Sequence, residues 1–264
     1  MRSIKGKDFN MDVSQQSTQQ RGAEPLYRKF HRACLAICVV LAPLVLFLGF
    51  ALDPTGGVGV PSNRFHILPS SARLLAANFQ AASPLQTQLF LYFNAVTVYF
   101  FPLSFIGLGL LALRRSPWLA TLGMIFGLAG SLPFAVFVGL EALGAALGQF
   151  GASPSNAGMS QYVFSQGAVV LLAGSWVLGH LLGYVITGIA LIRSRAIPLW
   201  AALLFIVGIP FQAAGYGTHV SILQLICFAL IFLGSIPAAL AILKLRDEQA
   251  HALVPTVEER TPTS

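Results

Sequence analysis

Residues Ala33–Leu52 read ACLAICVVLAPLVLFLGFAL, twenty residues in a row without a charged side chain. A run of this length predicts a transmembrane helix, because about 20 apolar residues rising about 1.5 Å each cross the roughly 30 Å hydrocarbon core of a bilayer. The run follows a basic leader of 32 residues and shows no small-residue cleavage site. We therefore expect an uncleaved first span and not a secretory signal peptide.

The same pattern extends along the chain. Of its 264 residues, 56% are hydrophobic and only 9% are charged, and the mean hydropathy is +0.75. Soluble domains carry about 25% charged residues, so the composition excludes a soluble globule and predicts an all-α, polytopic bundle of six membrane helices. The five further predicted spans are Leu89–Leu113, Trp118–Gly148, Gly167–Ile192, Leu199–Gly217 and Val220–Leu243. We interpret Trp118–Gly148 as one long helix that is tilted or projects beyond the bilayer.

The basic residues predict the orientation of the chain. Fourteen of the 16 Lys and Arg residues fall in the tails 1–32 and 244–264 or in the turns after the second and fourth spans. Because short cytoplasmic segments are enriched in positive charge, both termini are expected in the cytoplasm, with the protein in a bacterial plasma membrane. Anionic lipids of the inner leaflet are the partner that these charges imply. Nucleic acid is not indicated, since the basic residues are not interleaved with aromatic ones.

Three segments lie outside the predicted spans. The tails 1–32 and 244–264 are polar and are predicted to be disordered, because they cannot bury enough apolar surface. The outer loop 53–88 is rich in Gly and Pro at first and then contains a Ser cap before a weakly amphipathic stretch. A short interfacial helix is expected near residues 71–82.

Two cytoplasmic turns resemble each other, at Gly107–Trp118 (GLGLLALRRSPW) and Gly188–Trp200 (GIALIRSRAIPLW). Either all inward-ending helices share a basic end followed by Pro and Trp, or a helical hairpin has been duplicated. The sequences AANFQ at 76–80 and RSRAIPLW at 193–200 also resemble a group of uncharacterised bacterial six-helix membrane proteins, a domain of unknown function. The resemblance covers about 33–209 and implies the fold and the membrane location, but no activity.

Small residues on two spans predict how the helices pack, because lipid-embedded helices approach closely where side chains are small. The third span carries a row at intervals of four, Gly123, Gly127, Ser131, Ala135 and Gly139, and the fourth span carries a similar row, Ser175, Gly179, Gly183 and Thr187. We expect the third and fourth spans to cross closely through these rows. Prolines inside the spans, including Pro133, predict kinks.

His180 is the most informative polar residue, because it lies at the midpoint of the fourth span, where lipid offers no hydrogen-bond partner. Trp176 and Tyr184 lie one helical turn to either side of it. Two interpretations stay open. In one, these three side chains line a cavity in which neutral His180 binds a ligand or relays protons. In the other, the imidazole hydrogen-bonds to a backbone carbonyl of a kinked neighbouring helix.

Glu141 is the one formally charged residue in the six predicted spans, and its position predicts a place near the outer interface. Seven other polar residues are expected at the same level: Asn94, Gln149, Gln161, Gln166, Gln212, His219 and Gln224. Together these side chains could form an outward-open polar pocket, or each could contact headgroups and water separately.

No catalytic, metal-binding or cofactor-binding motif is recognisable: the chain has no Gly-rich phosphate loop, no H-E-x-x-H and no G-x-S-x-G. Cys34, Cys38 and Cys227 have no spacing typical of a metal site and are expected to pack as small apolar residues. The leading hypothesis is a non-enzymatic bundle that binds or moves a small amphiphile or lipid in an outward-facing cavity. The alternatives are a small membrane enzyme acting through His180 or Glu141, and a structural subunit packing against a second copy or another membrane protein.

Overall fold

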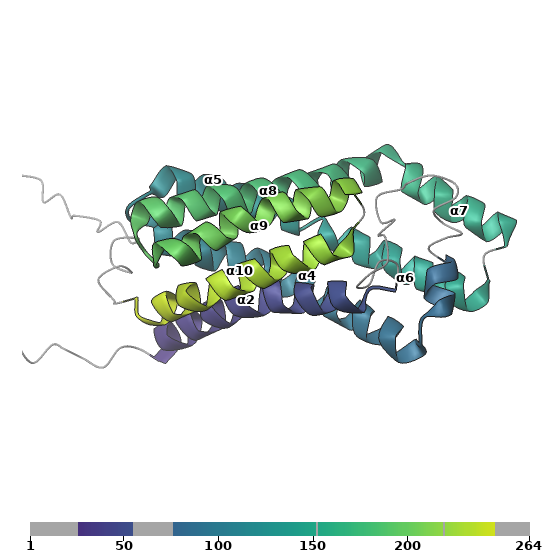
Figure 1. The fold of residues 1–264 in the computed structure, drawn as a ribbon, viewed down its shortest axis with the longest axis horizontal. Helices are drawn as coiled ribbons and strands as arrows, with labels where there is room; N and C mark the ends of the chain where they lie inside the picture. Colours follow the sequence, from purple (N-terminus) through teal and green to yellow (C-terminus); the bar gives the residue numbers. More distant parts are fainter. Residues whose placement is uncertain (1–25, 55–75, 152, 219, 246–264) are drawn as a thin grey trace, which may run out of the picture.

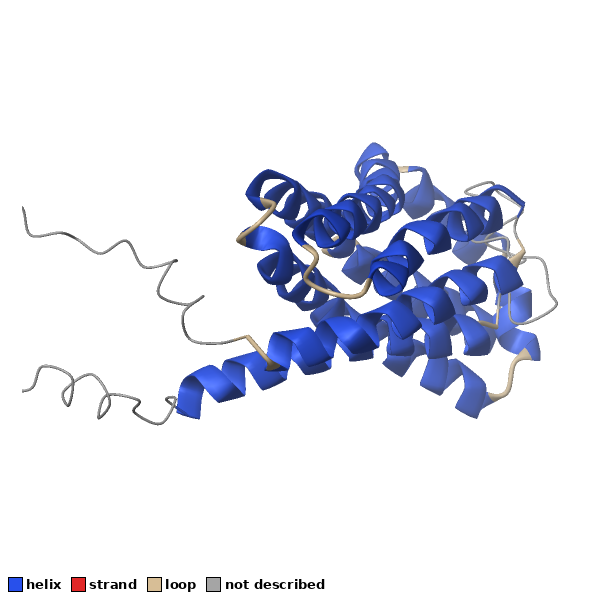
Figure 2. Cartoon of the chain, turned by 60° about the vertical axis from the view of Figure 1, so that its left-hand side comes forward, coloured by secondary structure: helices blue, strands red, loops and turns tan. Residues whose placement is uncertain are grey.

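The computed structural model describes residues 26–54, 76–151, 153–218 and 220–245, and the elements of these ranges are helices (Figure 1, Figure 2). They are α2 (Leu26–Leu52), α4 (Pro84–Leu113), α5 (Pro117–Ser131), α6 (Phe134–Phe150), α7 (Pro154–Ser165), α8 (Gly167–Ser194), α9 (Leu199–Thr218) and α10 (Ser221–Leu243). With α5 and α6 taken together, six helical segments are long and apolar enough to cross a membrane. The predicted all-α bundle of six candidate spans is therefore confirmed.

The spans form a closed ring. In this ring α4 contacts α5, α5 contacts α8, α8 contacts α9, α9 contacts α10, α10 contacts α2, and α2 contacts α4. Most neighbours in the ring are also neighbours along the chain, as expected for helices joined by short turns. Both described ends of the chain lie at one end of the bundle, which we call the terminal end, and the opposite end is the distal end (Figure 1).

The helices of the ring differ in length. The helix α9 has 20 residues, whereas α8 has 28 and α4 has 30. At about 1.5 Å per residue, α9 is roughly 30 Å long and α4 roughly 45 Å. In Figure 1, α4, α6 and α7 continue past the level at which α9 and α10 end. The distal end is therefore uneven: the longer helices on one side of the ring extend further than the shorter helices on the other side. We call this difference in height the step.

The third span, Pro117–Phe150, is one candidate membrane span made of two helices, α5 and α6, with the interruption at Pro133, where the sequence predicts a kink. The regular α-helical hydrogen bonding is interrupted at Leu132 and Pro133, between α5 and α6, although both residues keep right-handed helical dihedrals. The physical reason is that proline has no N–H to donate to the preceding turn. The last bond of α5 runs from Leu132 N to Leu128 O (3.0 Å). The next two, from Ala135 N to Leu132 O (3.4 Å) and from Val136 N to Pro133 O (3.0 Å), span three residues instead of four.

Several boundaries also differ from the sequence-based expectation. The helix α2 begins at Leu26, so the end of the predicted disordered tail is helical, and the basic side chain of Arg32 donates a hydrogen bond to the Leu245 carbonyl. The helix α7 was not predicted; Ser153 caps it by accepting from Asn156 N (3.2 Å), and Pro154 occupies its first turn. The remaining tail residues, 1–25 and 246–264, lie outside the described residues.

A short helical segment, residues 76–81, lies at the distal end. It falls within the predicted interfacial helix 71–82, of which residues 71–75 lie outside the described residues. A Cβ added at Gly148 of α6 would lie 2.8 Å from Phe79 Cβ, and the Phe79 and Phe90 rings lie 6.0 Å apart. The segment therefore packs between the distal ends of α6 and α4.

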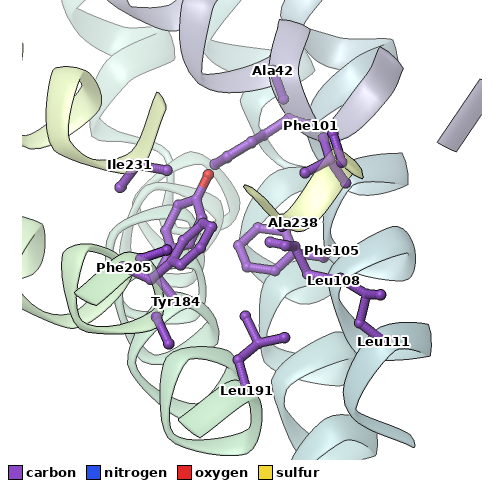
Figure 3. Close-up of a cluster of buried hydrophobic side chains, with 14 of the residues drawn as sticks. Ala42, Phe101, Phe105, Leu108, Leu111, Tyr184, Leu191, Phe205, Ile231 and Ala238 are labelled. Carbon is purple, nitrogen blue, oxygen red and sulfur yellow. The ribbon is translucent and has the colours of Figure 1, made fainter. Parts of the chain in front are cut away.

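Aromatic side chains fill the centre of the bundle. Phe101 and Phe105 of α4, Tyr184 of α8 and Phe205 of α9 are fully buried and converge on one another (Figure 3). The Tyr184 ring lies 4.7 Å from Phe105 and 6.0 Å from Phe205, measured between ring centroids. This cluster lies on the terminal side of the polar residues described next.

Candidate functional site

The close crossing of α5 and α8 positions the central polar residues. A Cβ added at Gly183 would lie 2.7 Å from Gly127 Cα, and one added at Gly179 would lie 2.6 Å from Gly130 Cα. One turn further toward the terminal end, Gly123 lies against Thr187. Backbone meets backbone along this crossing, so no side chain larger than hydrogen fits at these glycines.

The predicted small-residue rows are only partly brought together. Gly130, which the rows omit, is in contact with the backbone of His180. Ala135 and Gly139 are exposed, and nothing lies within 4 Å of a Cβ added at Gly139. Each step of four residues turns the row by about 40°, so Gly139 points about 160° away from Gly123 even before the break at Pro133. Including these two residues in the packing face was wrong.

The two serines of the rows bond within their own helices. Ser131 Oγ donates to Leu128 O (3.3 Å), and Ser175 Oγ donates to Leu172 O (2.8 Å). Ser131 is fully buried, whereas Ser175 is half-buried. A serine that returns its hydrogen bond to its own helix remains small and apolar toward its neighbours.

His180 sits among aromatic rings. Its imidazole stacks on Trp176 with 4.2 Å between ring centroids, and Phe134 covers the same indole at 4.5 Å. The Phe101 ring lies 6.2 Å from the imidazole. His180 and Trp176 are 0% and 3% exposed, so the predicted stripe of Trp176, His180 and Tyr184 faces the bundle interior and not the lipid.

A chain of hydrogen bonds connects His180 with α9 and α10. Tyr216 Oη lies 3.4 Å from His180 Nε2, and Gln212 Nε2 donates to Tyr216 Oη (2.8 Å). Cys227 Sγ donates to Gln212 Oε1 (3.4 Å). Three helices of the ring therefore meet through side chains at one depth. We call His180, Gln212, Tyr216, Gln224 and Cys227 the polar cluster.

The protonated nitrogen of His180 decides which atoms donate and which accept in this series of hydrogen bonds. His180 Nδ1 bonds to the carbonyl of Trp176, and a carbonyl can only accept, so Nδ1 carries the proton. In a neutral imidazole Nε2 is then an acceptor, and the Tyr216 hydroxyl donates to it. The imidazole thus bonds to a carbonyl of its own helix, not to one in a neighbouring helix as one interpretation of the sequence had it.

Gln224 is the member of the polar cluster whose hydrogen-bonding capacity is not used. Its side chain is 1% exposed, and neither Nε2 nor Oε1 has a hydrogen-bond partner among the described residues. A Cβ added at Gly215 would lie 2.8 Å from Gln224 Cγ, which places Gln224 beside the chain segment that carries Tyr216. Its amide therefore adds a donor and an acceptor next to the hydrogen-bonded chain.

The predicted outward-open pocket does not form as one unit. Gln212 belongs to the polar cluster, whereas Asn94 packs against Gly49 of α2 and donates to Phe90 O (3.0 Å). Glu141 is half-buried on α6, 11 residues beyond Gly130 and so about 16 Å of helix further toward the distal end than His180. His219 lies outside the described residues. Placing Gln212 and Glu141 at one level was wrong, because α9 is short and ends near the level of His180.

Sequence reasoning missed Tyr216 and undervalued Gln224 and Cys227. A signal was present: Gln212 and Tyr216 are four residues apart, and Gln224 and Cys227 are three apart, so each pair shares one helix face. Both pairs lie on the hairpin formed by α9 and α10. Polar pairs on adjacent apolar helices predict a shared buried site.

Within the described ranges there is no group of three or more His, Cys, Asp or Glu side chains that could hold a metal ion. Comparison with known proteins finds no family model, no curated protein and no solved structure that matches the chain. The resemblance to a bacterial six-helix family, carried by residues 76–80 and 193–200, stays a prediction.

Proposed function

We propose that this membrane protein binds a small amphiphile whose polar group hydrogen-bonds to the polar cluster. The observation that carries the proposal is the buried amide of Gln224, which has no partner among the described residues at either end. A buried polar group without partners costs about 1–3 kcal/mol of stability. A ligand with one hydroxyl or carbonyl group would satisfy this amide and offset that cost.

The chemistry of the polar cluster favours an uncharged ligand head. Its members are neutral imidazole, amide, phenol and thiol groups, and the rings of Trp176 and Phe101 lie around the imidazole. A phosphate or carboxylate would need a cation at the same depth, because an unpaired charge is costly in an apolar interior. An alcohol, ketone, amide or ester head with an apolar tail matches both the cluster and its surroundings.

The step at the distal end supports entry from that side. Gln224 lies three residues from the first residue of α10, about 5 Å from the end of that helix. Tyr216 lies two residues before the end of α9 and is only half-buried, while its hydroxyl bonds to the fully buried Gln212. A molecule entering at the short side of the ring would reach the half-buried Tyr216 before the fully buried Gln224.

An enzyme in which His180 and Glu141 act together on one substrate is disfavoured, whereas an enzyme acting through either residue alone stays an alternative. About 16 Å of helix separates their levels, so the two groups do not share a site. A structural subunit remains the alternative that the binding experiment addresses, because such a subunit would hold no ligand.

The binding experiment compares three purified proteins by native mass spectrometry from mild detergent, followed by extraction and identification of bound molecules. The wild type is expected to carry a small amphiphile in stoichiometric amount. Gln224→Met, which keeps the side-chain volume but removes the amide, should lower its occupancy about tenfold, equivalent to about 1.4 kcal/mol.

Gln149→Met is the matched control, because Gln149 lies exposed on α6 at the same end of the bundle. Its occupancy should equal that of the wild type. A wild-type protein without any bound molecule, or equal occupancy in Gln224→Met, would contradict the proposal and favour the structural subunit.

We also propose that the terminal end faces the cytoplasm of a bacterium. Arg114, Arg115, Arg193, Arg195 and Lys244 are exposed at that end, in the arrangement that the positive-inside rule associates with cytoplasmic turns. A green fluorescent protein fused after residue 264 should fluoresce, and alkaline phosphatase at the same position should be inactive. The reverse pattern would overturn this orientation.

A further inference from the structure

The two similar turns singled out in the sequence meet in space at the terminal end. One connects α4 with α5 and the other connects α8 with α9. The Arg115 guanidinium donates to the carbonyl of Ser194 (3.1 Å), which ties the first turn to the second across 79 residues of sequence. Ser194 is 2% exposed, so the bond is anchored in the bundle.

Four guanidinium groups lie on these two turns. Arg114, Arg115, Arg193 and Arg195 are all exposed. Arg195 ends α8 in the left-handed conformation (φ 52°), which turns the chain sharply and keeps the second turn close to the first. Within the described residues the two acidic side chains, Asp53 and Glu141, both lie on distal parts of the chain. No described carboxylate therefore balances these four charges.

Two tryptophans flank the arginines. Trp118 opens α5 with 81% of its surface exposed, and Trp200 opens α9 with 56% exposed. Tryptophan concentrates at the boundary between hydrocarbon and headgroups, because its ring is apolar and its N–H is polar. The arginines beside these rings therefore lie at headgroup depth. At this depth the guanidinium groups lie among lipid phosphates, so a lipid phosphate is a more suitable ligand than a phosphate ion dissolved in water.

We propose that the turns 114–118 and 193–200 together form a specific site for the phosphate of an anionic phospholipid. Arginine suits this role, because its planar fork of donors matches two phosphate oxygens at once. Arg115 holds the two turns together through Ser194, and Arg114, Arg193 and Arg195 supply the free donors. The acyl chains lie against the apolar flanks of α5 and α9. The site is independent of the amphiphile site at the polar cluster, which lacks a cation.

The test is a titration of the purified full chain with phosphatidylglycerol, followed by native mass spectrometry, with phosphatidylcholine as the reference lipid. The wild type should bind one phosphatidylglycerol at least about tenfold more tightly than phosphatidylcholine. The double variant Arg114→Gln/Arg193→Gln should lose this preference. Arg114→Lys/Arg193→Lys, which keeps the charge and removes the fork, should lose about half of it on a logarithmic scale.

The control removes two charges from the same end on the opposite side of the ring. Lys29 on α2 and Lys244 after α10 are exposed, and Lys29→Gln/Lys244→Gln should bind within about twofold of the wild type. Equal losses in both double variants would overturn the proposal, because they would show attraction by overall charge. Displacement of the lipid by millimolar inorganic phosphate would also overturn it, since the site would then recognise a soluble anion.

Discussion

The two halves of the third span, α5 and α6, have similar composition, but the glycines near the middle of the span have different surroundings in the two helices. In α5, Gly123, Gly127 and Gly130 lie against the backbone of α8. In α6, Gly139 has open space around it. Both helices are apolar and glycine-rich, so the difference does not come from residue type. It comes from the path of the backbone, because the row of glycines turns around the helix by about 40° every four residues and the helix is interrupted at Pro133. Glycine therefore marks a contact only where the backbone path brings a partner.

Among the substitutions considered, Gly130→Leu in α5 is expected to lower stability the most. A Leu side chain at position 130 would overlap the backbone of His180, which cannot move without displacing α8. Overpacking against backbone exceeds the usual cost of about 1–3 kcal/mol, so Gly130→Leu should abolish the monodisperse folded protein in detergent. Gly139→Leu is the matched variant and should stay within about 1 kcal/mol of the wild type. Similar thermal unfolding of the two variants would refute the packing difference.

The second largest loss of stability is expected in the polar cluster, which lies near the level where α5 and α6 meet. Gln212→Leu removes the link between Tyr216 and Cys227 and leaves the Tyr216 hydroxyl without its donor. Side-chain hydrogen bonds between membrane helices contribute about 0.6–1.7 kcal/mol, so unfolding free energy should fall by about 1–2 kcal/mol. Thermal unfolding in detergent measures it. An unchanged midpoint would mean that the chain of hydrogen bonds does not stabilise the bundle.

A smaller loss of stability is expected for Gly148→Ala at the distal end of α6. Gly148 is again in close contact, with Ala76 O at 2.9 Å and Gln80 N at 3.0 Å from an added Cβ, but its partner is a short local segment. Gly148→Ala should therefore cost only about 1 kcal/mol and should release residues 76–81 locally. Hydrogen exchange should speed up in that segment and not in α8. A global change in exchange would contradict this.

The smallest effect is expected to be favourable. The Tyr184 hydroxyl is buried and has no hydrogen-bond partner among the described residues. Tyr184→Phe removes this cost and keeps the ring contacts with Phe105 and Phe205, so stability should rise by up to about 1 kcal/mol. Tyr216→Phe is the matched variant, and it should destabilise, because its hydroxyl bonds to Gln212 and His180. Destabilisation by Tyr184→Phe would indicate a partner for its hydroxyl.

The fold class was predictable because the signals that decide it are local. Each span contains enough apolar residues to be recognised by itself, and the charged residues between spans mark the turns. Gly179 and Gly183 were also recognisable as a packing surface. The length of α4 was not, since its first turn depends on Ser83, whose hydroxyl accepts from Gln86 N (3.1 Å).

The polar cluster was less predictable, because depth within the membrane depends on where each helix begins. Gln212 was expected near the outer interface with Glu141, but α9 is short, and the same residue lies level with His180. The sequence did not single out Tyr216, because tyrosine is common at the ends of membrane helices. Only contacts between helices reveal that its hydroxyl points inward to two buried groups.

The unequal helices of the ring have a consequence for the lipid around them. On the short side, α9 offers about 30 Å of helix, whereas Val170 and Leu171 of α8 expose apolar surface about 35 Å from the terminal end of that helix. A bilayer of uniform thickness cannot match both sides, so we expect the protein to tilt or the distal leaflet to thicken next to α8. The mismatch between protein and bilayer is therefore expected to differ from one side of the bundle to the other.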